Sequence, residues 1–173
     1  MQLFHVSEEA NISIFEPRIP TRDDLDKEVG LVWALNERTL PNFLTPRDCP
    51  RVTYHAVEST SPEDIIKFFS STLKHCVAIE QGWYKRMTKT KLYLYEFEPT
   101  NFYLQDQTAG FYVSEKVEKP ISVTEVDDLF AALFDKNVEV RILDSLWPLG
   151  DAVQKSTLYW SLCRMRNANS RCN

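Results

Sequence analysis

Short runs of β-branched and aromatic residues recur along this 173-residue chain, and they limit what it can fold into. Runs of this length and composition are typical of strands. They lie at 2–6, 29–35 (VGLVWAL), 51–57 (RVTYHAV), 75–79, 91–97 (KLYLYEF), 110–114, 121–125 and 138–143 (VEVRIL). Because the strands do not alternate regularly with helices, the pattern predicts an α+β fold of mixed, mainly antiparallel sheets with flanking helices.

Three segments have the features of helices. Ser61, followed by Pro62 and two acidic residues, is a good start for a helix that ends near residue 70. The segment 126–136 carries one apolar stripe, and Asn137 is a suitable end for it. Apolar residues at helical spacing between 144 and 160 predict a final helix there.

Length and charge limit the organisation and the partners of the chain. A single globular domain is expected over residues 1–167, with 168–173 as a flexible C-terminal tail. The formal net charge is −5, from 25 acidic and 20 basic residues, which disfavours nucleic acid as a partner. No apolar stretch approaches the ~20 residues of a membrane span. Without a secretory signal pattern at the N-terminus, the expected location is the cytoplasm.

Several enzyme classes have no matching motif. With four glycines in all, the chain has no glycine-rich loop of the P-loop or dinucleotide-binding kind. Kinases, P-loop ATPases and Rossmann-type dehydrogenases are therefore excluded. The four cysteines form no C-x-x-C pair and no two of the three histidines have ligand spacing, so no metal site is expected.

Two strand regions offer candidate ligand or catalytic residues. His5 lies at the centre of the first expected strand, with Ser7 on the same face, so both are candidate ligand-binding residues. The alternative for His5 is a core or edge histidine bonded to the backbone. Glu115 directly follows the strand at 110–114 and is the candidate catalytic residue, as a base or hydrogen-bond acceptor. The alternative for Glu115 is a solvated turn residue.

Arginines beside prolines are candidate anion ligands. The segment 46–51 reads PRDCPR, and Arg18 also follows a proline. Proline fixes the backbone, and two guanidinium forks held in place can grip a phosphate or a carboxylate. Arg18, Arg47 and Arg51 are therefore candidate ligand-binding residues. The alternative is a network of Arg47 and Asp48 that closes a turn.

A series of longer motifs resembles a known family. The segments LFHVSEEANISIFEPR, LVWAL, PRDCPRVT, FYVSEKVEKPISV, VEVRILDSLWPLGDAV and RMRNA occur in this order. Together they resemble a bacterial family of uncharacterised conserved proteins over nearly the whole chain. That family is a domain of unknown function, so the resemblance implies no activity.

A looser resemblance involves the layout of three strands. The first strand with His5, the apolar strand VWAL and the late segment FYVSEKVEKPISV are similar to the layout of ADP-ribosyltransferase-like folds. This resemblance implies that His5 holds the ribose of NAD or a related nucleotide and that Trp33 stacks on nicotinamide. It also implies a glutamate near Phe111, whereas this sequence offers Glu115, shifted along the turn.

Three functional hypotheses follow. The shifted glutamate favours a domain that binds a nucleotide or another small anion on a degenerate ADP-ribosyltransferase-like fold. The second hypothesis is an active NAD-dependent ADP-ribosyltransferase or phosphotransferase-like enzyme with Glu115 as its catalytic residue. The third is a protein-interaction module, for example a homodimer. Aromatic residues, which anchor many interfaces, make up 12% of the chain, and Tyr54, Tyr93 and Tyr95 are expected to be exposed.

Overall fold

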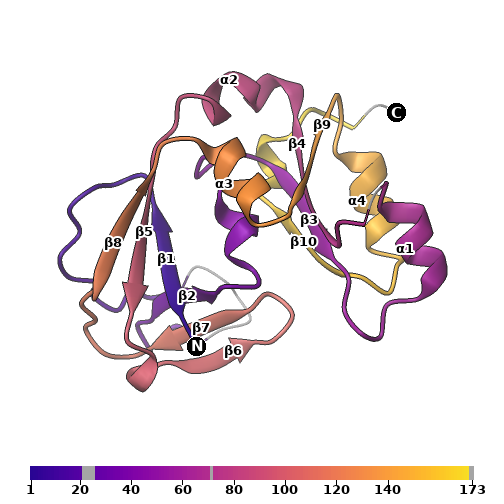
Figure 1. Cartoon of the computed structure of the whole chain (residues 1–173). Helices are drawn as coiled ribbons and strands as arrows, with labels where there is room; N and C mark the ends of the chain where they lie inside the picture. Colours follow the sequence, from indigo (N-terminus) through magenta and orange to yellow (C-terminus); the bar gives the residue numbers. More distant parts are fainter. Residues whose placement is uncertain (21–25, 71, 172–173) are drawn as a thin grey trace. The chain divides into compact units, whose positions relative to one another are not determined.

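The computed structural model describes residues 1–20, 26–70 and 72–171 (Figure 1). Two compact units share the chain, and each is made of two segments that are separated in the sequence. Unit 1 comprises residues 1–40 and 92–126, and unit 2 comprises residues 41–91 and 127–173. The single domain expected over residues 1–167 stays a prediction.

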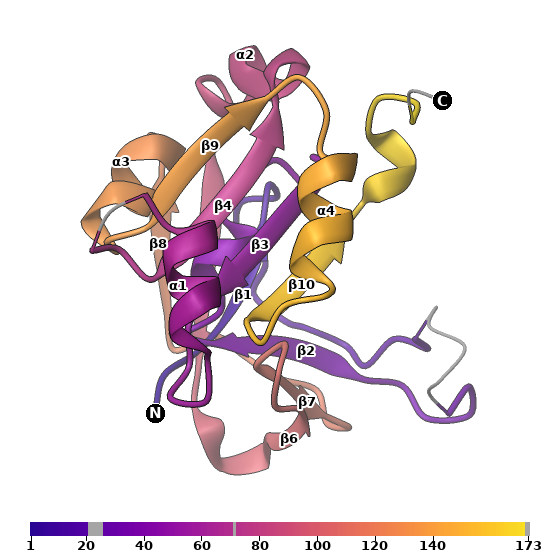
Figure 2. The same ribbon diagram turned by 90° about the vertical axis from the view of Figure 1, so that its right-hand side faces the viewer.

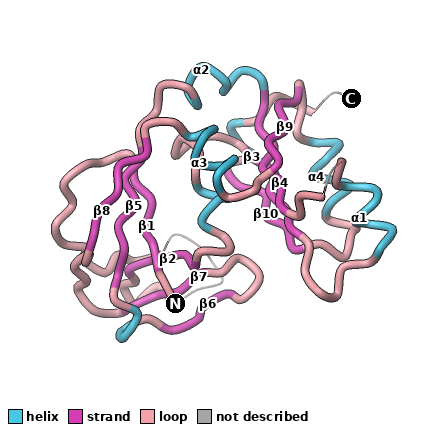
Figure 3. The backbone as a smooth tube through the Cα atoms, viewed as in Figure 1, coloured by secondary structure: helices cyan, strands magenta, loops and turns pink. Residues whose placement is uncertain are grey.

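Unit 1 is built on a six-stranded sheet with the order β6-β7-β2-β1-β5-β8 and antiparallel pairings. Figure 3 shows that mainly loops join these strands. A buried cluster that includes Leu3, Ala34 and Tyr95 packs on one face. The elements are β1 (Leu3–Ser7), β2 (Val32–Asn36), β5 (Leu92–Phe97), η3 (Pro99–Asn101), β6 (Tyr103–Asp106), β7 (Phe111–Ser114) and β8 (Ser122–Val126).

Unit 2 is built on a four-stranded sheet with the order β10-β3-β4-β9. In the described part of the chain, β10–β3 and β3–β4 are antiparallel pairs and β4–β9 is a parallel pair. Its strands are β3 (Arg51–His55), β4 (His75–Glu80), β9 (Glu139–Leu143) and β10 (Tyr159–Cys163). Its helices are α1 (Pro62–Phe68), α2 (Tyr84–Met87), α3 (Leu129–Asp135) and α4 (Trp147–Val153). Short 3₁₀ turns are η1 (Leu40–Phe43), η2 (Gln81–Trp83) and η4 (Met165–Asn167).

The helices α1 and α4 pack on one face of the four-stranded sheet (Figure 2). Between them and the sheet lies a core that contains Val52, Tyr54 and Ala78 from the strands, Phe68 from α1 and Val153 from α4. Side chains alternate along a strand, so Arg51 and Cys163, which are paired across β3 and β10, lie on the opposite face. This alternation determines which residues are available for a site.

The predicted ends of two helices are confirmed. The Oγ of Ser61 accepts a hydrogen bond from the backbone N–H of Asp64 at 3.2 Å, and Pro62 occupies the first turn of α1. Asn137 adopts a φ of 56° after α3. Asparagine tolerates this left-handed conformation, which turns the chain out of the helix.

The α+β class with mixed, mainly antiparallel sheets is confirmed, but the final helix expected over 144–160 is wrong in its second half. α4 ends at Val153, and residues 159–163 form β10 instead. The physical reason is the pairing with β3, which satisfies the backbone groups of both strands. Residues 168–171, where the sequence predicts a flexible tail, are held by hydrogen bonds described below; residues 172 and 173 of that tail lie outside the described residues.

Candidate functional site

His5 and Trp33 lie on opposite faces of the six-stranded sheet. His5 is paired with Tyr95, a fully buried residue of the unit 1 core. Ala34 faces the same core, so the neighbouring Trp33 points to the other side. There its ring packs edge-on against Phe111, with 5.3 Å between the ring centroids. The structure therefore does not bring together the two residues that the NAD-site resemblance needs in one cleft.

The other contacts of His5 and Ser7 are local. The Nδ1 of His5 lies 3.0 Å from the backbone oxygen of Trp33, and its ring centroid is 4.9 Å from that of Phe15. Ser7 accepts a hydrogen bond from the N–H of Glu9 at 3.1 Å. These contacts match the alternative in which His5 is a backbone-bonded histidine at the core.

Glu115 is held at the surface of the outer strands of unit 1. The Oη of Tyr103, on β6, donates to its Oε1 at 3.0 Å. Partial burial, together with this hydrogen bond, raises the pKa of Tyr103 above its ordinary value. Glu115 is thus engaged by Tyr103 of the neighbouring strand β6.

Sequence reasoning missed a buried carboxyl group three residues later. Glu118 is 7% exposed and accepts a hydrogen bond from the Oγ of the fully buried Ser114 at 2.5 Å. The same Oγ accepts the N–H of Lys116 at 3.1 Å. The pair therefore closes the turn after β7. The sequence signal was the serine and glutamate four residues apart around a turn, which is weak on its own.

In unit 2, Arg51 is a buried cation at the start of β3. It is 4% exposed, its Nε donates to the backbone oxygen of Asn42 at 2.6 Å, and its Nη1 donates to that of Cys49 at 3.0 Å. Its guanidinium also lies over the ring of Phe43, at 4.9 Å from the centroid. Within the described part of the chain, Arg51 forms no ion pair with a carboxylate. Burial lowers its pKa, as expected for a charge with neutral partners.

The loop that carries Arg47 is joined to the segment after β10. The Nε of Arg164 donates to the backbone oxygen of Arg47 at 3.3 Å. The side-chain amide of Asn167 donates to the backbone oxygen of Asp48 at 2.7 Å. Arg164 itself adopts a left-handed conformation, with φ 54° and ψ 26°, which is costly for a residue with a side chain. The side chain of Arg164 thus contacts the loop that carries Arg47.

A further arginine comes from α2. Arg86 lies over the ring of Trp83, 4.6 Å from its centroid, and its charge acts on Cys49 together with that of Arg51. Burial nevertheless dominates at this thiol and raises its pKa to about 12. Glu80 also acts on Cys49, so acidic and basic groups meet at this end of the sheet.

Four arginines from three segments therefore gather at one end of the four-stranded sheet. We name Arg47, Arg51, Arg86 and Arg164 the arginine cluster. The structure brings the predicted Arg47 and Arg51 together in unit 2, whereas Arg18 belongs to unit 1 and joins Leu31 through backbone hydrogen bonds. Sequence reasoning missed Arg86 and Arg164 as members, because only the strand order places their segments beside the 46–51 loop.

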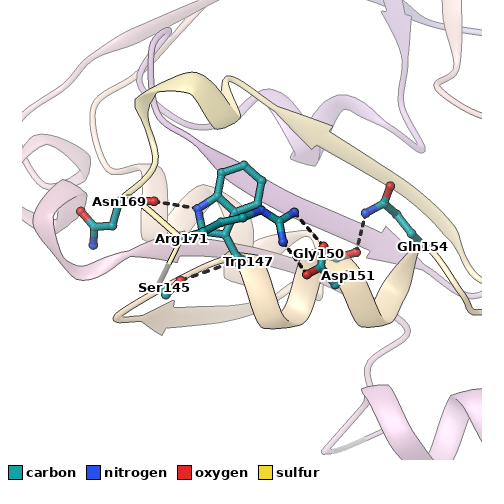
Figure 4. Close-up of polar contacts among 7 residues, drawn as sticks. All are labelled: Ser145, Trp147, Gly150, Asp151, Gln154, Asn169 and Arg171. Carbon is teal, nitrogen blue, oxygen red and sulfur yellow. Dashed lines mark hydrogen bonds and ion pairs between the residues drawn. The ribbon is translucent and has the colours of Figure 1, made fainter. Parts of the chain in front are cut away.

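A buried carboxylate at the same end of the sheet, that of Glu80, accepts hydrogen bonds from backbone groups. Glu80 is 2% exposed, and its two oxygens accept the N–H of Leu146 at 3.3 Å and that of Asn169 at 2.8 Å. Asn169 also donates to the backbone oxygen of Asp144 at 2.8 Å and accepts the indole N–H of Trp147 at 2.7 Å (Figure 4). Glu80 thereby ties β4, the start of α4 and the C-terminal segment together.

Two residues further, Arg171 binds the surface of α4. Its Nη1 and Nη2 donate to the two carboxylate oxygens of Asp151 at 2.7 and 2.9 Å, and its guanidinium lies 4.2 Å from the ring centroid of Trp147 (Figure 4). The hydrogen bonds from Arg171 hold the pKa of Asp151 below its ordinary value. We name Asn169 and Arg171, with Trp147 and Asp151 beneath them, the C-terminal clasp.

Comparison with known proteins defines the family. Residues 4–168 match the model of a family of unknown function, DUF6886, and the chain belongs to this family. No curated protein and no solved structure matches the chain. The resemblance to ADP-ribosyltransferase-like folds therefore stays a prediction.

Among residues 1–20, 26–70 and 72–171, no three His, Cys, Asp or Glu side chains gather as ligands of a metal ion. In the same described ranges, no helix has both the length and the apolar character that a membrane crossing requires.

Proposed function

We propose that this protein binds a small anionic molecule, with a phosphate or carboxylate group, at the arginine cluster of unit 2. In this proposal Arg47, Arg86 and Arg164 contact the anion and Arg51 is a buried scaffold. A nucleotide is one member of this ligand class.

The observation that carries the proposal is the gathering of four arginines at one end of the four-stranded sheet, where the fold brings segments distant in the sequence together and two of the arginines, Arg51 and Arg164, donate to backbone oxygens. Arg51 is buried with carbonyl partners, and among the described residues no carboxylate forms an ion pair with Arg164. The hydrogen bonds described for Glu80 come from backbone N–H groups and not from an arginine of the cluster. A charge held away from water without an opposite charge favours an anion nearby, and arginine forks suit phosphate and carboxylate oxygens.

The conformation of Arg164 supports the same proposal. Non-glycine residues in the left-handed region cost free energy and are concentrated at ligand sites. The backbone of Arg164 has this conformation at the point where β10 ends. Its side chain reaches back to the loop of Arg47 instead of pointing along the strand. This arrangement supports a role for Arg164 in ligand binding.

Isothermal titration with inorganic pyrophosphate tests the proposal. We expect saturable binding that Arg164→Ala weakens, because a charge-assisted hydrogen bond contributes about 1.5–3 kcal/mol, or about 10- to 150-fold in Kd. Arg18→Ala, which removes an exposed arginine of unit 1, is the matched control and is expected to bind like the wild type. Absence of binding at millimolar pyrophosphate, or equal loss in both variants, would overturn the proposal.

The same titration separates this proposal from the enzyme hypothesis. NAD and ADP-ribose are run beside pyrophosphate, with nicotinamide release measured as the readout of transfer. The opposite faces of His5 and Trp33 lead us to expect no release. Nicotinamide release by the wild type that is lost in Glu115→Gln would instead support the hypothesis of an active ADP-ribosyltransferase.

A second candidate function is association with another copy of the chain, and exposed aromatic residues favour it. Tyr54 and Tyr95, which the sequence led us to expect at the surface, are fully buried in strands. Tyr84 and Phe134, by contrast, are 49% and 58% exposed. Phe130 lies between them, at centroid distances of 5.7 Å and 6.4 Å. Aromatic side chains of this kind anchor interfaces. Light scattering after size-exclusion chromatography is expected to show a dimer that Phe134→Ser dissociates; a monomer at all concentrations would exclude this function.

A further inference from the structure

The C-terminal clasp and the arginine cluster are two ends of one short segment. Residues 164–171 begin with Arg164, which bonds the Arg47 loop, and end with Arg171, which bonds α4. Between them Asn167 bonds the loop of Asp48, and Asn169 bonds Glu80. A segment fixed at both ends has little freedom in the middle, so its two ends affect each other.

We propose that the C-terminal clasp positions the arginine cluster, so that anion binding and docking of the clasp on α4 stabilise each other. This inference rests on the proposed function and adds its regulation. The clasp residues are positioning residues, which do not touch the anion themselves.

The hydrogen bonds explain why the site needs the clasp. Arg164 is in the left-handed conformation, a state that persists only where surrounding contacts enforce it. Its own side chain supplies one hydrogen bond to the Arg47 loop, of 3.3 Å. The shorter bonds lie further along, at Asn167 and Asn169. Release of the clasp therefore loosens the part of the segment that holds Arg164 in its binding conformation.

The contacts of the clasp allow it both to dock on α4 and to detach from it. Its ion pair is bidentate, and the guanidinium also stacks on Trp147, which gives it a defined geometry. Both charged side chains remain about half exposed, at 55% for Arg171 and 45% for Asp151. Exposed ion pairs are weak and screened by salt. Since coupling between two sites is reciprocal, an anion bound at Arg164 stabilises the docked clasp.

The substitution Asp151→Ala distinguishes a positioning role of the clasp from a purely electrostatic effect on the anion. This substitution removes a negative charge, so long-range electrostatics alone would tighten the binding of an anion. If the clasp positions the site, the same substitution weakens binding, by at least about fivefold, the lower end of typical coupling. Arg171→Ala weakens binding under both explanations and serves as the comparison. Titration of both variants with pyrophosphate shows directly whether the affinity rises or falls. Thermal denaturation verifies that each variant is folded.

A charge swap and hydrogen exchange complete the experiment. Asp151→Arg combined with Arg171→Asp restores an ion pair and is expected to regain part of the lost affinity. In the wild type, pyrophosphate is expected to slow hydrogen exchange of the amides from 164 to 169, and this protection is expected to be lost in Asp151→Ala. The inference is overturned if Asp151→Ala binds pyrophosphate as tightly as the wild type or more tightly while Arg164→Ala binds it more weakly. If Arg164→Ala binds like the wild type, the proposed function itself fails.

Discussion

Replacement of Gly110 by alanine tests how the six-stranded sheet closes its turn before β7. Gly110 has a φ of 64°, and its backbone oxygen accepts the N–H of Asn36 at 3.1 Å. A Cβ at this position would meet the Oγ1 of Thr39 and lie 2.6 Å from the Oδ1 of Asn36. Those two atoms are hydrogen-bonded to each other at 3.0 Å. The methyl group thus strains the backbone and separates a bonded pair.

The magnitude follows from these two effects. The left-handed backbone costs a residue with a Cβ about 1–2 kcal/mol, and each hydrogen bond lost between Asn36 and Thr39 costs about 1 kcal/mol. Gly110→Ala is therefore expected to lower the free energy of unfolding by about 2–4 kcal/mol. Gly82→Ala is the matched control, because a Cβ there meets no atom within 4 Å. It is expected to stabilise the protein by about 0.4–1 kcal/mol.

Urea titration followed by tryptophan fluorescence and by far-ultraviolet circular dichroism measures both variants. Coincident transitions from the two probes establish that a single free energy describes the unfolding. The reasoning is refuted if Gly110→Ala lies within about 0.5 kcal/mol of the wild type, the range of an ordinary surface substitution. It is also refuted if Gly82→Ala is the more destabilised of the two.

Two more predictions concern ionisable groups. Burial raises the pKa of Cys49 and of Cys76 to about 12, so iodoacetamide at about pH 8 is expected to label the half-buried Cys163 and spare these two in the native protein. Peptide mass mapping checks this, and native labelling of Cys76 would contradict it. At Glu139, hydrogen bonds that include that from Arg141 outweigh burial and hold the pKa below its ordinary 4.5. The contribution of Glu139 to stability is present above pH 4.5 and is lost as the pH falls through the lower pKa of the folded state. Glu139→Gln is therefore expected to flatten the decline in the free energy of unfolding between about pH 5 and about pH 3. An unchanged slope in this variant would contradict the prediction.

Local patterns predicted most of the strands and the ends of the helices, because those depend on neighbouring residues. The capping serine of α1 and the left-handed Asn137 after α3 are such features. β10 was not predictable in the same way. Apolar residues at helical spacing continue beyond Val153, and only pairing with β3 makes Tyr159–Cys163 a strand. Tertiary pairing outweighs periodicity at this point.

The candidate site was predictable in part for the same reason. Arg47 and Arg51 share a proline-bounded segment, so their closeness is a local property. Arg86 and Arg164 approach that segment because β3, β4 and β10 are neighbours. That proximity depends on strand order, which a single sequence does not contain. Conversely, Trp33 is a candidate by resemblance alone, and the alternation of side chains along β2 places it on the face opposite His5.

The interleaved order of the two units has a consequence for synthesis on the ribosome. Unit 1 has its full sequence at residue 126, whereas unit 2 at that moment holds only residues 41–91. The missing part includes β9 and β10, the strands at both edges of the four-stranded sheet. Until they emerge, β3 and β4 lack the strands that cover their outer edges in the finished sheet, and open strand edges pair readily with other chains. The nascent protein is therefore most in need of protection from aggregation during the synthesis of its last quarter, when the sequence of unit 1 is already complete.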